Sequence, residues 1–92
     1  MSNVKTDELS KKFKALSHPA RLEILELLKD NACICGDIVD VLPLAQATVS
    51  QHLKVLKEAG FIFGEESGTK VCYMLNRKAL DDFKKEVQLL KI

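Results

Sequence analysis

The chain has 92 residues, of which 47% are hydrophobic and 29% are charged, which is typical of one small globular domain and excludes a disordered chain. The net charge is +1, which is weak support for a nucleic-acid partner, but residues 41–92 hold eight basic and six acidic residues. No apolar run reaches membrane-spanning length, and the first residues have no signal-peptide core. We therefore expect a cytoplasmic protein with no membrane partner.

Two helices are predicted at the start of the chain. Residues 5–16 predict the first, because Leu9, Phe13 and Leu16 recur at helical spacing. The sequence Ser17-His18-Pro19 is typical of a helix start, since proline fits the first turn. The helix that follows is apolar over most of its circumference, so we expect a central core helix that ends near Asn31. Residues Ala32 to Cys35 then favour a short extended segment.

The run from Gly36 to Phe63 has the sequence form of a helix-turn-helix. A short apolar segment ends at Pro43, and a longer segment with helical period continues to Gly60. One face of the longer helix is apolar, and its other face is polar in a way that suits the base edges and phosphates of a DNA major groove. The candidate DNA-binding residues of this helix are Gln46, Ala47, Thr48, Ser50, Gln51, His52 and Lys54.

These candidates divide by expected role. Thr48 and Lys54 are expected to contact phosphate, whereas His52 has two interpretations: it lies on the groove side, or it covers the edge of the core as a hydrogen-bonded residue. The other four are expected to face base edges, because glutamine can pair with adenine, serine with several bases, and alanine can touch a thymine methyl. A polar stripe of this kind is also what a merely solvated helix presents.

A hairpin and a last helix complete the chain. Residues 61–66 and 71–75 predict two strands around Ser67-Gly68-Thr69. Lys70 at this hairpin is a candidate for a flanking phosphate or the minor groove, or is only solvated. Residues 77–91 predict a last helix, whose apolar stripe is formed by Leu80, Phe83, Val87 and Leu90.

Helix, helix, helix-turn-helix, β-hairpin and helix is the order of a winged helix-turn-helix. Four motifs stand at matching places: residues 15–22 (ALSHPARL), 48–56 (TVSQHLKVL), 58–60 (EAG), and Gly68 with Val71 and Tyr73. With these motifs the chain resembles the ArsR/SmtB family of bacterial metal-responsive repressors. The resemblance implies a mainly α fold with a small β-hairpin, in one domain over residues 1–92. One departure is Ala45, where many members have a serine that caps the helix, a contact typically worth about 1 kcal/mol.

The resemblance also implies a function and an assembly. Family members are homodimers that bind palindromic double-stranded operator DNA and repress transcription until an inducer weakens the DNA contact. We expect this chain to dimerise through its first and last helices, whose apolar stripes a domain this small cannot cover alone. The candidate interface residues are Leu9, Phe13, Leu16, Leu80, Phe83, Val87 and Leu90.

Three cysteines are candidate inducer ligands. Cys33-Ile34-Cys35 stands just before the helix-turn-helix, where arsenic-sensing members of the family carry Cys-x-Cys, and soft thiolates suit As(III), Sb(III), Cd(II) or Zn(II). Ile38 stands where a further thiol can follow in those sensors, so a third thiolate would have to come from Cys72. Strand alternation weakens this, because it points Cys72 outward. Thiol oxidation, or three inert cysteines packed as small apolar residues, are the alternatives.

Other site types find little support. The last helix contains no histidine, so Asp81, Asp82 and Glu86 are more simply part of a solvated face with interleaved lysines than a zinc or nickel site. We see neither a nucleophile–base arrangement nor a glycine-rich phosphate loop, so we expect neither an enzyme nor a required cofactor. A regulator without metal sensing and a winged-helix protein-interaction module remain as alternatives.

Overall fold

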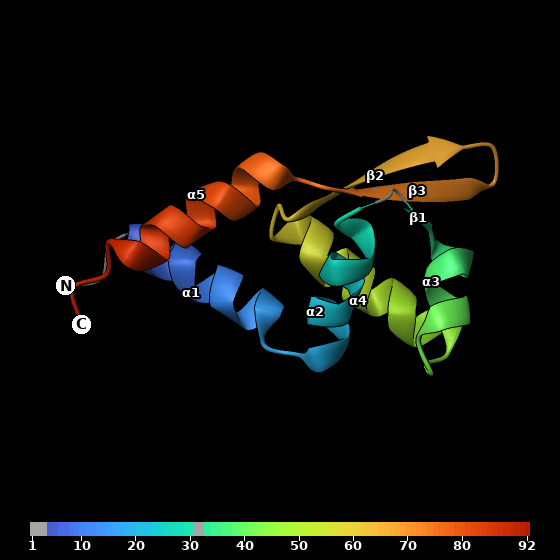
Figure 1. Ribbon diagram of the computed structural model, residues 1–92, viewed down its shortest axis with the longest axis horizontal. Coiled ribbons are helices and arrows are strands. Elements are labelled where there is room, and N and C mark those ends of the chain that lie inside the picture. Colours follow the sequence, from blue (N-terminus) through green and yellow to red (C-terminus); the bar gives the residue numbers. More distant parts are fainter. Residues whose placement is uncertain (1–3, 31–32) are drawn as a thin grey trace.

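The computed structural model describes residues 4–30 and 33–92, and its elements follow the order expected for a winged helix-turn-helix (Figure 1). The expectations for Asn31 and Ala32 lie outside the described residues. Among the described helices, none combines the length and the hydropathy that a membrane crossing needs. The elements are α1 (Val4–Leu16), α2 (Pro19–Leu28), β1 (Cys33–Ile34), α3 (Cys35–Val41), α4 (Gln46–Glu58), β2 (Ile62–Ser67), β3 (Lys70–Leu75) and α5 (Arg77–Gln88).

The molecule is elongated, with extents of 45 × 22 × 20 Å. The start of α1 and the end of α5 lie side by side at one end, and α3 and the β2–β3 wing lie at the other (Figure 1). Between them runs α4, which packs against α1, α2, α3 and β2. The apolar side of α4 therefore forms the centre of the core, whose fully buried side chains are Ile24, Ile38, Val49, Leu53, Leu56 and Phe61.

The second helix begins where the sequence predicts. Pro19 is its first residue, and His18 precedes it with extended backbone and accepts a hydrogen bond at Nδ1 from the Ala20 amide, at 3.1 Å. The prediction that α2 is buried on most sides is wrong at Leu22, which is 49% exposed. The reason is that α2 borders a surface groove on the side of α5, so that only one of its faces reaches the core.

The end of α4 explains why the wing starts one residue later than predicted. Gly60 has a φ of +87°, its amide donates to the Lys57 carbonyl, and the Phe61 amide donates to the Leu56 carbonyl. This is the Schellman arrangement, in which a glycine just past the helix satisfies carbonyls that would otherwise lack partners. Phe61 therefore closes the helix, and β2 begins at Ile62.

The sheet has three antiparallel strands in the order β1-β3-β2. Gly68 lies in the tight turn of the hairpin with a φ of +66°, which a residue with a side chain rarely adopts. The short strand β1 pairs with β3, so the extended segment before α3 lies against the second hairpin strand. In this register Cys33 lies opposite Tyr73 and Ile34 lies opposite Cys72.

The last helix starts at a side-chain cap and ends earlier than predicted. Asn76 accepts a hydrogen bond from the Ala79 amide at 3.1 Å, and its Nδ2 donates to the Gly60 carbonyl at 3.0 Å. The helix ends at Gln88. Beyond it the Leu90 amide donates to the Val87 carbonyl, a tightened turn that does not continue the helix. Assigning Leu90 to the helical stripe is therefore wrong.

Helices α1 and α5 pack on each other within one chain. The Phe83 ring lies edge-on to Phe13, at 5.2 Å between centroids, and to Phe61, at 5.5 Å. Leu9 and Phe83 are each only 8% exposed, so the prediction that one chain cannot cover these stripes is wrong for these two residues. Phe13 remains 44% exposed, whereas Leu16, Leu80 and Val87 are half-buried.

Candidate nucleic-acid interface

Helix α4 has one buried and one exposed face. Val49, Leu53 and Leu56 are completely buried on the inner face, at the spacing of helical turns. Lys57 is exposed one turn beyond Lys54, so the exposed face carries positive charge near its end. Of the seven predicted DNA-binding residues of this helix, six are exposed: Gln46, Ala47, Thr48, Ser50, Gln51 and Lys54.

The start of α4 tolerates the missing serine. Ala45 has an extended backbone, and no side chain caps the first turn. The Ala45 carbonyl still accepts the first hydrogen bond of the helix, from Val49 at 3.0 Å. The helix therefore begins at Gln46, held by burial of its apolar face rather than by a cap.

His52 is the exception among the predicted contacts. It is 8% exposed, and its Nδ1 accepts a hydrogen bond from Nε of Arg21 at 3.1 Å. Its ring also lies against that of His18, at 4.3 Å between centroids. Of the two interpretations of His52, the structure therefore supports the hydrogen-bonded residue at the core edge, and the groove-side interpretation is wrong.

Arg21 links three helices and was not predicted from the sequence. While its Nε donates to His52 of α4, its Nη1 donates to the carbonyls of Lys14 and Ala15 in the last turn of α1, both at 3.2 Å. These carbonyls lie where a helix runs out of backbone donors, so a guanidinium is a favourable partner. The resemblance motif contains Arg21 and His18, but nothing in their spacing pointed to a residue 31 positions further along.

Burial holds the pKa of His52 below its ordinary value of 6.5, and the charges of His18 and Arg21 act in the same direction. The folded chain therefore holds a proton on this ring less tightly than the unfolded chain. The resulting stabilisation is fully present above about pH 6.5 and is lost as the pH falls from there toward the folded pKa. Folding and the Arg21 contact both favour a neutral His52.

The wing adds a second candidate contact. Lys70 is exposed at the first position of β3, directly after the Gly68 turn. It pairs with Ser67 at the turn end of the hairpin. Its contact with phosphate or the minor groove stays a prediction.

The cysteines lie where the wing meets the helix-turn-helix. Cys33 belongs to β1, Cys35 is the first residue of α3, and Cys72 lies in β3 as a half-buried free thiol. The register sets Cys72 opposite Ile34 and not opposite either of the other cysteines. In the part of the chain with described side chains, no three histidine, cysteine or carboxylate residues cluster as metal ligands.

Two of the three carboxylates predicted to be solvated on α5, Asp82 and Glu86, contact lysines. Asp82 accepts a hydrogen bond from Lys78 at 2.9 Å, and this bond holds the pKa of the Asp82 carboxyl below its usual range. Glu86 forms a salt bridge with Lys12 of α1 at 3.2 Å. The first pair lies along one face of α5, and the second joins α5 to α1.

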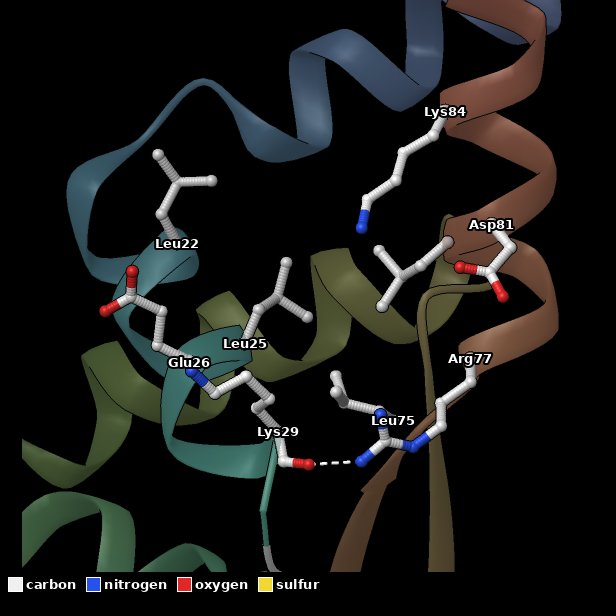
Figure 2. A pocket seen from close by; sticks show the side chains of 9 residues that line it. Leu22, Leu25, Glu26, Lys29, Leu75, Arg77, Asp81 and Lys84 are labelled. Atoms are coloured by element: carbon white, nitrogen blue, oxygen red, sulfur yellow. Dashed lines mark hydrogen bonds between the residues drawn. The ribbon is translucent and has the colours of Figure 1, made fainter.

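A groove of about 430 Å³ lies between α2, the end of β3 and the start of α5 (Figure 2). The apolar part of the groove is formed by Leu22, Leu25, Leu75 and Leu80. Arg77 spans it and donates to the Lys29 carbonyl. None of the candidate DNA-binding residues of α4 or of the wing lines it, so the groove is separate from the candidate DNA-binding face.

The chain is similar to known regulators over most of its length. The sequence model of the family "Bacterial regulatory protein, arsR family" matches residues 18–62. The transcriptional repressor SdpR of Bacillus subtilis (strain 168) is 39% identical over 70 residues, which cover 76% of this chain and 78% of SdpR. The arsenical resistance operon repressor of Staphylococcus xylosus is 36% identical over 83 residues, which cover 90% of this chain and 80% of that protein.

A solved structure matches the whole architecture. The solution NMR structure of a homodimeric winged helix-turn-helix DNA-binding domain from Mycobacterium bovis, a possible ArsR-family transcriptional regulator, superimposes with a TM-score of 0.78. The two sequences are 27% identical, and the match covers 97% of this chain and 85% of the M. bovis chain. Together with the exposed polar face of α4, these similarities show that the chain belongs to the arsR family of bacterial regulatory proteins.

Proposed function

We propose that this protein is a transcriptional repressor that binds double-stranded operator DNA as a homodimer. The observation that carries the proposal is the division of α4, whose apolar side fills the core while Gln46, Ser50, Gln51 and Lys54 remain exposed on the opposite side. A helix so placed can enter a major groove, and the wing with Lys70 can reach the flanking backbone. The proposal places the protein in the cytoplasm with the DNA and requires no enzymatic chemistry.

The apolar residues left exposed near α1 and α5 support the dimer. Phe13 of α1 is 44% exposed, and Leu89 and Leu90, which follow α5, are 77% and 38% exposed. Covering such residues with a second copy removes apolar surface from water. To read DNA, a two-fold dimer through these residues has to hold its two copies of α4 about 34 Å apart, one turn of DNA.

Lys54→Ala should weaken binding to every DNA sequence, because Lys54 is expected to contact phosphate rather than a base. Loss of one phosphate contact lowers the slope of log affinity against log salt concentration by about one. Fluorescence anisotropy with a labelled duplex at several salt concentrations measures this slope. Lys85→Ala is the matched control, because it removes the same charge from an exposed position on α5. Equal slopes for Lys54→Ala and wild type would show that α4 does not face the phosphates.

We further propose that Cys33 and Cys35 bind a soft ion as inducer. Both positions join the wing to the first helix of the helix-turn-helix, so an ion held there acts directly on the DNA-reading unit. Thiolates suit As(III), Sb(III), Cd(II) and Zn(II), and a relative regulates arsenical resistance. The register between Ile34 and Cys72 favours a site with two protein sulfurs over one with three.

A protein-interaction module and a regulator without metal sensing are the alternative functions. A protein-interaction module would bind DNA only weakly and without dependence on Lys54, so the anisotropy experiment with Lys54→Ala tests this alternative. The second predicts DNA binding that ignores soft ions.

A further inference from the structure

The Arg21 cluster, defined as Arg21, His18 and His52, joins the recognition helix to the rest of the fold. Arg21 donates to His52 on the inner side of α4, and through its other nitrogen to the Lys14 and Ala15 carbonyls of α1. The two ends of this connection therefore lie on the helix proposed to read DNA and on a helix proposed to lie near the dimer axis. The angle between these helices decides how far apart the two recognition helices stand in a dimer.

We propose that Arg21 is a positioning residue, which fixes α4 relative to α1 through His52, and that operator binding weakens when His52 takes up a proton. This inference rests on the proposed function. Neither Arg21 nor His52 needs to touch DNA for the effect, because the cluster acts on the orientation of α4.

The hydrogen bonds dictate why a proton breaks the contact. Nδ1 of His52 accepts from Nε of Arg21, so in the neutral ring the proton resides on Nε2. A second proton can bind only at Nδ1, where it removes the acceptor and faces a guanidinium that cannot release its own proton. The protonated ring and Arg21 therefore repel each other where they previously bonded.

Among the described groups that shift the pKa of His52, no negatively charged one would stabilise its protonated form. The described groups that shift the pKa of this ring are His18, from the turn before α2, and Arg21 from α2, with no carboxylate among them. On α1, Lys14 and Ala15 contribute carbonyl oxygens, and both are bound to Arg21. Protonation is therefore coupled to separation of the cluster and not to a new ion pair.

The sign of the pH effect distinguishes this mechanism from simple electrostatics. Adding a positive charge near DNA, a polyanion, would by itself tighten binding as the pH falls. The proposal predicts the opposite for the wild-type protein, namely that the dissociation constant rises at least about fivefold between about pH 8 and about pH 5 at constant salt. Dissociation constants are compared only at pH values where the far-ultraviolet circular dichroism of the protein is unchanged. Global unfolding then does not contribute to the difference.

Three variants test the assignment to the cluster. His52→Asn keeps an acceptor near the position of Nδ1 but does not titrate, so the pH dependence should become flat or reverse. Arg21→Lys keeps the charge but replaces the rigid fork, which bonds the ring through Nε and the carbonyls through Nη1, with a single flexible nitrogen. Binding at about pH 8 should therefore weaken and lose its pH dependence. His18→Asn keeps a cap for α2 and removes one charge beside His52, so the pH dependence should persist with its midpoint at higher pH.

The outcomes separate this inference from the proposed function. If wild type binds DNA with the expected salt dependence but His52→Asn shows the same pH ratio, the positioning role is overturned and the repressor assignment stands. The positioning role is also overturned if the DNA affinity of wild type stays constant or increases as the pH falls. If wild type binds no DNA at any pH, the proposed function itself fails.

Discussion

Phe83→Glu should leave most of the protein unfolded at 25 °C. Phe83 is 8% exposed and packs edge-on against Phe13 and Phe61, so the substitution removes these contacts and buries a carboxylate without a cation. Loss of a buried phenylalanine alone costs about 3–5 kcal/mol. The free energy of unfolding of such domains is only about 5–15 kcal/mol, and the buried charge adds to the loss. Urea unfolding followed by circular dichroism measures the change, and a midpoint close to that of wild type would contradict it.

Phe13→Glu is the matched control, because it separates folding from assembly. Phe13 is 44% exposed, so a carboxylate there can turn toward water while the chain stays folded. In the proposed dimer the same charge lies at the interface, where it weakens association. Sedimentation should therefore give folded monomers for Phe13→Glu at a concentration at which wild type is dimeric. A folded wild-type protein that sediments as a monomer at micromolar concentration would contradict the proposed assembly.

Cys33→Ser or Cys35→Ser should abolish release from DNA by soft ions. In the wild type, adding As(III), Sb(III) or Cd(II) should dissociate the operator complex, because a ligand that binds the free conformation more tightly shifts the equilibrium toward it. The coupling expected for such a switch is about 1–3 kcal/mol. Because the ligand is the thiolate, the concentration of ion needed should decrease as the pH rises. Anisotropy of a labelled duplex during titration with each ion measures the release.

Cys72→Ser distinguishes the two versions of the sensor. The register sets Cys72 opposite Ile34, so we expect this variant to respond to ions as wild type does. A loss of response in all three variants would mean a three-thiolate site that includes β3. If wild-type binding ignores the three ions and also mild oxidant, the sensor proposal is wrong and the regulator acts without metal sensing.

The order of the elements was predictable because it depends on local signals. Pro19 marks the start of α2, Gly60 the end of α4 and Gly68 the hairpin turn, and each acts through its own backbone conformation. The predicted and observed ends of α4 and α5 differ by a few residues, because hydrogen bonds past the helix decide where it ends. Phe61 closes α4 rather than opening β2, and the tight turn after Gln88 ends α5 before Leu90.

The tertiary contacts of the site were less predictable than its exposed face. The exposed positions of α4 follow from helical period, so Gln46 and Gln51 were correctly expected on the outer side. For His52 the helical period did not decide between the DNA-facing side and the core edge, and its contact with Arg21 in the structure did. That contact depends on how α1, α2 and α4 cross, which no spacing within one sequence encodes.

The central claim is that the two α4 helices of a symmetric dimer recognise the two halves of an operator. Selection of bound sequences from random duplex DNA tests this claim most directly. Wild type should enrich an inverted repeat whose half-sites lie about 10 base pairs apart from centre to centre. Gln51→Ala should enrich the same repeat with preference relaxed at one base pair in each half-site, at a cost of about 1–3 kcal/mol for that contact. If wild type enriches no sequence, or if Gln51→Ala enriches an identical one, α4 is not the element that reads DNA.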